Sequence, residues 1–160
     1  MDHIFWGQFY QESKKCVIAN IDSGYVDVVI DNVKFGDWNI WVKIIDKENF
    51  YSEYVFIYCK EDILTNHHLA NYSDPNNWIY KDTIYDDAEF LTVYDEKYYD
   101  PNNNEFSYIN LDYLSALKIM LNGVVFCSDY NTCGDIYLSK KQGKVIGIKI
   151  VRRECNDDDF

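Results

Sequence analysis

The sequence lacks the short motifs that identify common enzyme classes. Its seven glycines are scattered, and none falls in a GxGxxG or GxxxxGK[ST] pattern, which would place a backbone cradle around phosphate groups. A GxSxG nucleophile elbow is also missing, as are the HExxH and CxxC spacings that hold zinc. These absences lower the expectation of an enzyme, and they give no reason to predict a cofactor.

Long apolar runs are missing as well. No stretch approaches the roughly 20 apolar residues that a membrane-spanning helix needs. The first seven residues, MDHIFWG, lack the basic start and apolar run of a secretory signal. From these two absences we expect a cytoplasmic chain without a membrane partner.

Cysteines are few, and their number is odd. The five lie far apart, whereas a secreted disulfide framework favours an even number in a shorter chain. Cys16 and Cys59 lie in apolar runs and are typical of small buried hydrophobic residues. Cys127 and Cys133 could close a disulfide over a short loop, but the expected compartment favours thiols. We therefore expect a reduced chain, without a catalytic cysteine.

The histidines form no metal-binding pattern. His67 and His68 are adjacent, so on a helix they point about 100° apart and on a strand they point to opposite faces. Adjacent residues of this kind make a poor chelating pair. We expect a solvated or partly packed pair and no bound metal.

The chain is rich in acidic and aromatic residues. It has 27 acidic and 15 basic residues, a net charge of -12, and 18% of its residues are aromatic, with 15 tyrosines and 4 tryptophans. A disordered acidic tail would be poor in aromatics because it has no core to fill. The chain is therefore expected to fold with a negative surface, which repels nucleic acid and attracts basic proteins.

Alternation of apolar and polar residues predicts many short strands. Along 38–45, for example, Trp38, Ile40, Val42 and Ile44 share one face. The pattern indicates an antiparallel meander whose core includes 38–45 and 54–60. The expected strands are 4–10, 16–21, 25–30, 38–45, 54–60, 78–83, 89–94, 124–127, 135–138 and 144–151.

One segment has helical periodicity. In 110–122, Leu114, Leu117 and Leu121 are spaced for one helical face, Asn110 is a good N-cap and Gly123 can close the C-terminus. A second short helix is possible over 61–72. With no linker in the sequence, we expect residues 1–160 to form one α+β domain, in which the helix packs on a mostly antiparallel sheet.

The segment from 78 to 100 is the strongest candidate for a binding site. Seven acids lie between Asp82 and Asp100, opposed by Lys97 alone, and tyrosines are interleaved among them. Tyrosine and tryptophan anchor interfaces, while carboxylates orient a cationic partner. The alternative is that the tyrosines cover strand faces and the acids only keep the protein soluble. The candidate partner-binding residues are Trp78, Tyr85, Asp86, Asp87, Glu89, Tyr94, Asp95, Glu96, Tyr98 and Tyr99.

Composition suggests a function by analogy only. A small, acidic chain rich in Tyr and Trp and without enzyme motifs is similar to inhibitors that neutralise basic enzymes, such as the immunity proteins of bacterial nuclease toxins. The basic sites of nucleases accept phosphate, so a carboxylate-rich surface could occupy them. The competing hypotheses are a small-molecule or carbohydrate-binding or enzymatic domain with a Trp- and Tyr-lined pocket, and a phage or viral accessory protein. The sequence does not predict the oligomeric state.

Overall fold

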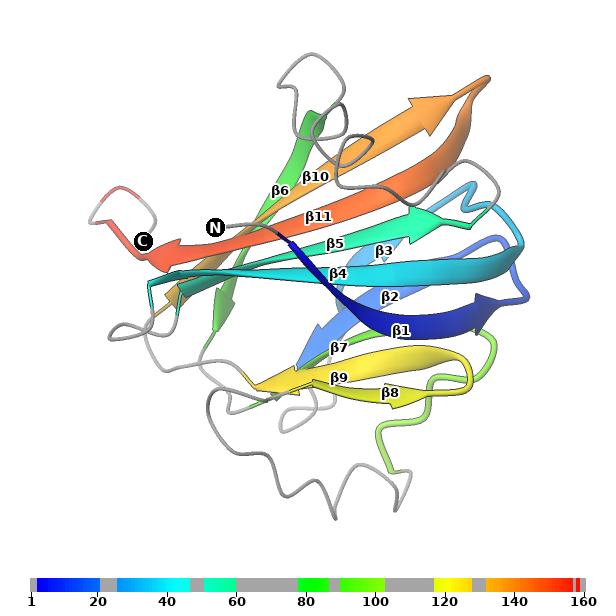
Figure 1. The fold of residues 1–160 in the computed structure, drawn as a ribbon, viewed down its shortest axis with the longest axis horizontal. Helices are drawn as coiled ribbons and strands as arrows, with labels where there is room; N and C mark the ends of the chain where they lie inside the picture. Colours follow the sequence, from blue (N-terminus) through cyan, green and yellow to red (C-terminus); the bar gives the residue numbers. More distant parts are fainter. Residues whose placement is uncertain are drawn as a thin grey trace.

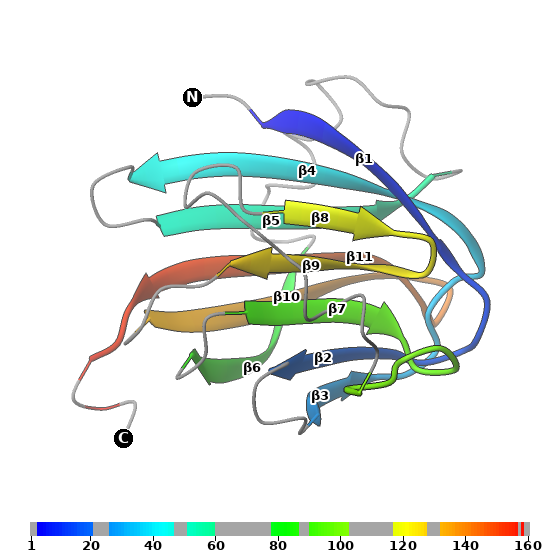
Figure 2. The ribbon, with the colours of Figure 1, turned by 90° about the horizontal axis from the view of Figure 1, so that it is seen from below.

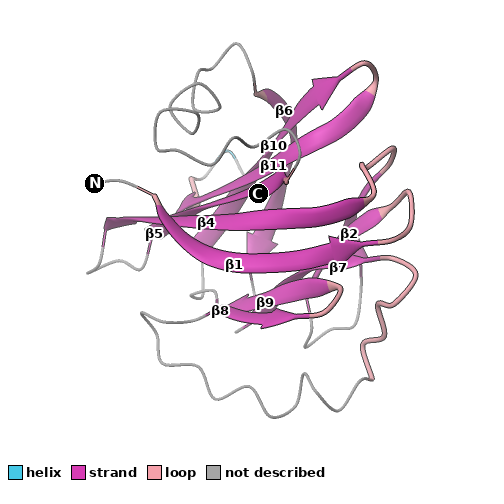
Figure 3. Ribbon diagram, turned by 45° about the vertical axis from the view of Figure 1, so that its right-hand side comes forward, coloured by secondary structure: helices cyan, strands magenta, loops and turns pink. Residues whose placement is uncertain are grey.

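The chain forms two antiparallel β-sheets. The computed structural model describes residues 3–20, 26–46, 51–59, 78–86, 90–102, 117–127, 132–156 and 158. These ranges hold eleven strands and no α-helix (Figure 3). The expected α+β class is therefore wrong for the described part of the chain, which is all-β. None of the described residues forms a helix long and apolar enough to cross a membrane.

The first sheet has six strands and contains both the first and the last strand of the chain (Figure 1). All its neighbouring strands are antiparallel. In spatial order the strands are β1 (Ile4–Gln11), β4 (Gly36–Asp46), β5 (Tyr51–Tyr58), β11 (Lys144–Glu154), β10 (Thr132–Lys141) and β6 (Ile79–Asp86).

The second sheet has five strands and lies against the first, as Figure 2 shows. Because the chain passes repeatedly between the two sheets, the expected simple meander is also incorrect. In spatial order the strands are β3 (Val26–Ile30), β2 (Cys16–Asn20), β7 (Phe90–Asp95), β9 (Gly123–Cys127) and β8 (Leu117–Met120).

The main core lies between the two sheets. Trp38, Ile40 and Val42 of β4 belong to it, which confirms the alternation expected for this segment. The second sheet supplies the opposing apolar side chains, and the Phe126 ring of β9 lies 4.5 Å from the Tyr54 ring of β5. The five-stranded sheet therefore occupies the place that the sequence assigned to a helix.

The helix expected over 110–122 is wrong where the structure describes it. Residues 117–120 form β8, which pairs with β9, and Leu121 in the following turn is 79% exposed rather than packed on the core. Met120 pairs with Gly123, so Gly123 begins a hairpin strand instead of ending a helix. Residues 110–116 and the second expected helix, 61–72, lie outside the described residues.

One disulfide contradicts the expectation of a reduced chain. Cys133 is bonded to Cys155, while Cys16 and Cys59 are free. Cys133 pairs in register with Arg153 of β11, so Cys155 comes within disulfide reach just after that strand, with 5.1 Å between the two Cα atoms. The alternative partner of Cys133, Cys127, has a side chain outside the described part.

Candidate functional site

The structure separates the ten candidate residues into two groups. Tyr94, Asp95, Glu96, Tyr98 and Tyr99 lie at the end of β7 and in the turn after it, in the five-stranded sheet. The second group lies at or just before β6, at an edge of the six-stranded sheet. It comprises Trp78, Tyr85 and Asp86, and the side chain of Asp86 is not described. Asp87 and Glu89 fall outside the described residues.

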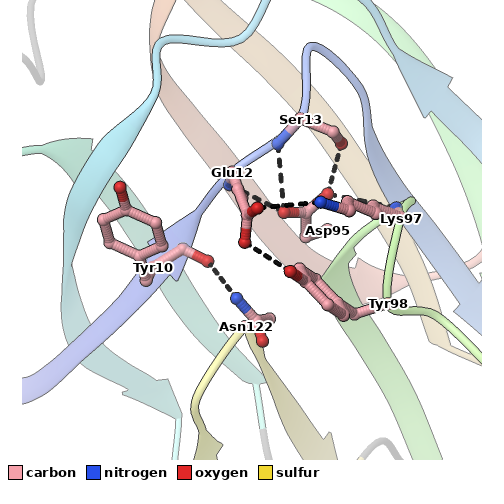
Figure 4. A network of polar contacts seen from close by, with 7 residues as sticks. All are labelled: Tyr10, Glu12, Ser13, Asp95, Lys97, Tyr98 and Asn122. Atoms are coloured by element: carbon pink, nitrogen blue, oxygen red, sulfur yellow. Dashed lines mark hydrogen bonds and ion pairs between the residues drawn. The ribbon is translucent and has the colours of Figure 1, made fainter.

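Asp95 is a buried internal acceptor. Its carboxylate accepts hydrogen bonds from the backbone N–H groups of Glu12 at 2.7 Å, Ser13 at 3.2 Å and Lys97 at 3.1 Å, and also from the Ser13 hydroxyl (Figure 4). An ionised carboxylate only accepts hydrogen bonds, so Asp95 gathers the donors of two turns. It fastens the β1–β2 turn to the end of β7 and does not face a partner.

The exposed groups around Asp95 are also paired with one another. Lys97 Nζ lies 2.8 Å from a Glu12 carboxylate oxygen, and the Tyr98 hydroxyl donates to the other oxygen (Figure 4). These bonds, first from Lys97 and then from Tyr98, hold the pKa of Glu12 below its usual value. Glu96 is exposed beside them. Because Lys97 offsets Glu12, this turn is not the strongly acidic surface expected from the sequence.

Three of the expected aromatic anchors pack inside the protein. Tyr94 is buried and Tyr99 packs beside it, with 6.4 Å between the ring centres. Trp78 is buried in a cluster with Trp41 and Ile57 on the six-stranded sheet. Their role in the described structure is packing.

The most exposed aromatic residues of the expected segment lie on β6. Tyr80 is 57% and Tyr85 is 42% exposed. Ile79 and Asp82 of the same strand are also exposed, and their pairing with Leu138 and Ile136 of the core turns them toward the other face of the sheet. We call these four residues the β6 surface. Of these four residues, only Tyr85 was expected from the sequence to bind a partner, although Tyr80 and Asp82 carry the same acidic-aromatic signal.

A hydrogen-bonded network positions the β6 surface. The Tyr80 and Thr83 hydroxyl oxygens are 2.6 Å apart, and the Thr83 hydroxyl donates to Asp135 of β10 at 2.7 Å. Arg153 of β11 donates to both Asp135 oxygens, at 2.7 and 3.1 Å. The Tyr80 ring also meets the Tyr137 ring edge-on, at 5.9 Å between centres. Tyr80 is therefore held by two neighbouring strands.

Most of the negative charge lies outside the described framework. The described ranges hold 14 of the 27 acidic residues and 13 of the 15 basic residues. The remaining residues therefore contain 13 acids and only 2 bases. The described residues are therefore close to neutral in sum, and the acidic excess belongs to the rest of the sequence.

Comparison with protein-family models, with curated proteins and with solved structures found no match to this chain.

Proposed function

We propose that this chain binds and neutralises a basic protein, and that the β6 surface takes part in the contact. The observation that carries the proposal is the pair of exposed tyrosines, Tyr80 and Tyr85, on the same strand as the exposed carboxylate of Asp82. Tyrosine anchors bury much area with few rotatable bonds, and a carboxylate on the same edge strand attracts an incoming lysine or arginine.

The network behind Tyr80 supports a protein partner rather than a sugar. A sugar that stacked on Tyr80 would need free hydrogen-bonding groups beside the ring. The carboxylate that joins the network of Tyr80, Asp135, already accepts from Thr83 and twice from Arg153. Protein interfaces, in contrast, gain from an aromatic side chain that is rigid before binding.

The class of partner follows from charge. With a net charge of -12, the chain attracts positively charged surfaces over a distance that depends on salt. Nuclease toxins have basic sites for phosphate, and inhibition of such a toxin by an immunity protein is the function we propose. A cytoplasmic location remains part of this proposal, but the Cys133–Cys155 disulfide speaks against it, because disulfides persist mainly in oxidising compartments.

Affinity capture tests the proposal and the surface together. The immobilised protein is exposed to an extract of its native cell at low and high salt, and captured proteins are identified. We expect a basic protein that binds at low salt, and whose enzymatic activity the purified chain inhibits at a one-to-one ratio.

Two charge reversals locate the contact. Asp82→Lys on the β6 surface should reduce capture, whereas Glu96→Lys in the turn after β7 serves as the matched control and should leave capture unchanged. Capture of only neutral or acidic proteins would refute the function. Loss of capture in the Glu96→Lys variant alone would instead move the contact to the other end of the molecule.

A further inference from the structure

The first strand exposes three consecutive apolar side chains. Ile4, Phe5 and Trp6 of β1 are 59%, 46% and 36% exposed, and β1 forms one edge of the six-stranded sheet. A run of exposed apolar residues on a soluble protein is unfavourable unless it serves a function. An edge strand also presents unpaired backbone donors and acceptors to other chains.

The other described edge strands carry charged residues, and β1 does not. Natural proteins place charged residues on edge strands to prevent pairing with other chains. Lys81 lies on β6, Asp27 on β3 and Lys118 on β8, which are the remaining edges of the two described sheets. The sequence of β1, IFWGQFYQ, has no charged residue.

Among the residues that the structure describes, only the first half of this edge has no neighbouring backbone bonded to it. At the other end, the Tyr10 N–H donates to the Leu121 carbonyl at 2.8 Å, and the Asn122 side chain donates to the Tyr10 carbonyl at 3.0 Å (Figure 4). The β8–β9 turn therefore already occupies the backbone of β1 at Tyr10. The part that can accept another strand is residues 4–8.

Neighbouring strands hold the open part in place. Phe5 pairs with Trp41 of β4 and Gly7 with Ile40, so Trp6 is the extra residue of a β-bulge. The Phe5 and Trp41 ring centres are 5.2 Å apart. A bulge redirects the side chain at its position, and here it leaves Phe5, Trp6 and Ile4 exposed in succession.

We propose that residues 4–8 of β1 receive an extended segment of a basic protein partner as an additional antiparallel strand of the six-stranded sheet. Main-chain hydrogen bonds would supply affinity, and apolar side chains of the segment would cover Ile4, Phe5 and Trp6. The cationic character of the partner rests on the proposed function. A second copy fits less well, because two chains of charge -12 repel each other.

A synthetic peptide of alternating valine and lysine is the probe, and a peptide of alternating valine and glutamate is its control. Hydrogen exchange of the full chain should slow at residues 4–8 when the lysine peptide is added, and the glutamate peptide should have no effect. Protection confined to β6, or no protection, would refute the proposal.

Side-chain variants test whether the apolar run anchors the peptide. The double change Phe5→Ser and Trp6→Ser should weaken binding about tenfold, as expected for loss of central anchors. Val26→Ser, at an exposed apolar position on β3 at an edge of the five-stranded sheet, should change binding less than twofold. If the double variant unfolds, Phe5→Ser alone replaces it. Unchanged affinity in a folded β1 variant, or dimerisation of the wild-type chain through β1 in sedimentation, would overturn the proposal.

The two proposals fail separately. If no basic protein is captured but the lysine peptide protects residues 4–8, the proposed function is refuted and the strand site remains. If a basic protein is captured and the β1 variants bind it normally, only the strand site is refuted.

Discussion

At the scale of single residues, Asp95 shows why a carboxylate cannot be interpreted from its neighbours in the sequence. It lies in the acidic segment expected to face a partner, yet it is fully buried. Its hydrogen-bond donors come from Glu12 and Ser13, more than 80 positions away, and from Lys97. A turn that folds back onto a strand end has no sequence signal at this distance.

We predict that Asp95→Ala destabilises the protein by roughly 1–3 kcal/mol or more, because several buried donors lose their acceptor at once. Chemical denaturation measures the change. Asp100→Ala is the matched control, since the Asp100 carboxylate is exposed and, within the described residues, accepts from the Asn102 N–H. Its effect should stay within about 0.5 kcal/mol. Equal effects of the two substitutions would mean that Asp95 does not hold the turns.

A second prediction at this scale concerns Glu53. Burial by itself raises the pKa of Glu53, but the 2.8 Å hydrogen bond from His3, with the nearby charges of His3, Lys149 and Lys43, lowers it below its usual value of 4.5. A carboxyl whose pKa is lower in the folded state stabilises the fold above its unfolded pKa, and this contribution is lost as pH falls through the folded pKa.

The denaturation midpoint of the wild type should therefore fall more steeply between about pH 5 and pH 3 than that of Glu53→Gln. His3→Ala should give a similarly shallow profile, because it removes the hydrogen bond that lowers the pKa. Parallel profiles of all three proteins would show that the His3–Glu53 pair contributes no pH dependence.

At the scale of elements, the alternation of apolar residues predicted the strands well and the helix badly. The expected strands 4–10, 16–21 and 144–151 match β1, β2 and β11 to within a few residues. Residues 117–120 are too short to separate a helical from a strand pattern. The Asn122-Gly123 pair that follows them suits the C-terminus of a helix and the turn of a hairpin equally well. Pairing with β9 decides between them, and that contact is not visible in the sequence.

The site was predicted less well than the strands, for a related reason. Residues 78–100 form one acidic-aromatic segment in the sequence, but they enter two different sheets, β6 in one and β7 in the other. Tyr94 and Trp78 turn out to be buried, while Tyr80 is exposed. Which tyrosines are exposed and can anchor a partner depends on the sheet that each strand joins. No local sequence pattern specifies that sheet.

The disulfide leads to a prediction about the end of the β10–β11 pair. It joins Cys133 and Cys155 across a sequence separation of 22. For a loop of this length, Cys155→Ser together with Cys133→Ser should cost about 2–4 kcal/mol, mainly because the unfolded chain gains freedom. Cys59→Ser should change stability much less, since this free thiol is only partly buried.

Thiol counting gives an independent measurement of the disulfide. In denaturant without reductant, Cys133 and Cys155 should not react with a thiol reagent, and they should react once reductant is added. Reaction of all five cysteines without reductant would restore the original expectation of a reduced chain.

At the scale of the whole molecule, the negative charge is spread unevenly along the chain. The described residues hold 14 acids and 13 bases, whereas the remaining segments of the sequence, with both ends, hold 13 acids and 2 bases. A long-range field sums over all charges, so it depends mainly on those segments. The short-range contacts of the β6 surface depend instead on the rigid sheet. Rates of association and dissociation should therefore respond to different substitutions.

We predict that the double change Asp87→Asn and Glu89→Gln lowers the association rate with a basic partner and leaves the dissociation rate nearly unchanged. The reason is that it removes two negative charges without removing an aromatic anchor. Tyr85→Ala should do the opposite and raise the dissociation rate. Raising ionic strength from about 0.01 to 1 M shortens the screening length from about 30 to 3 Å. The association rate of the wild type should then fall by more than tenfold, and that of the double variant by less. Surface plasmon resonance measures both rates in one experiment. An association rate insensitive to salt would mean that the negative charge does not guide binding, and the reason to expect a basic partner would be lost.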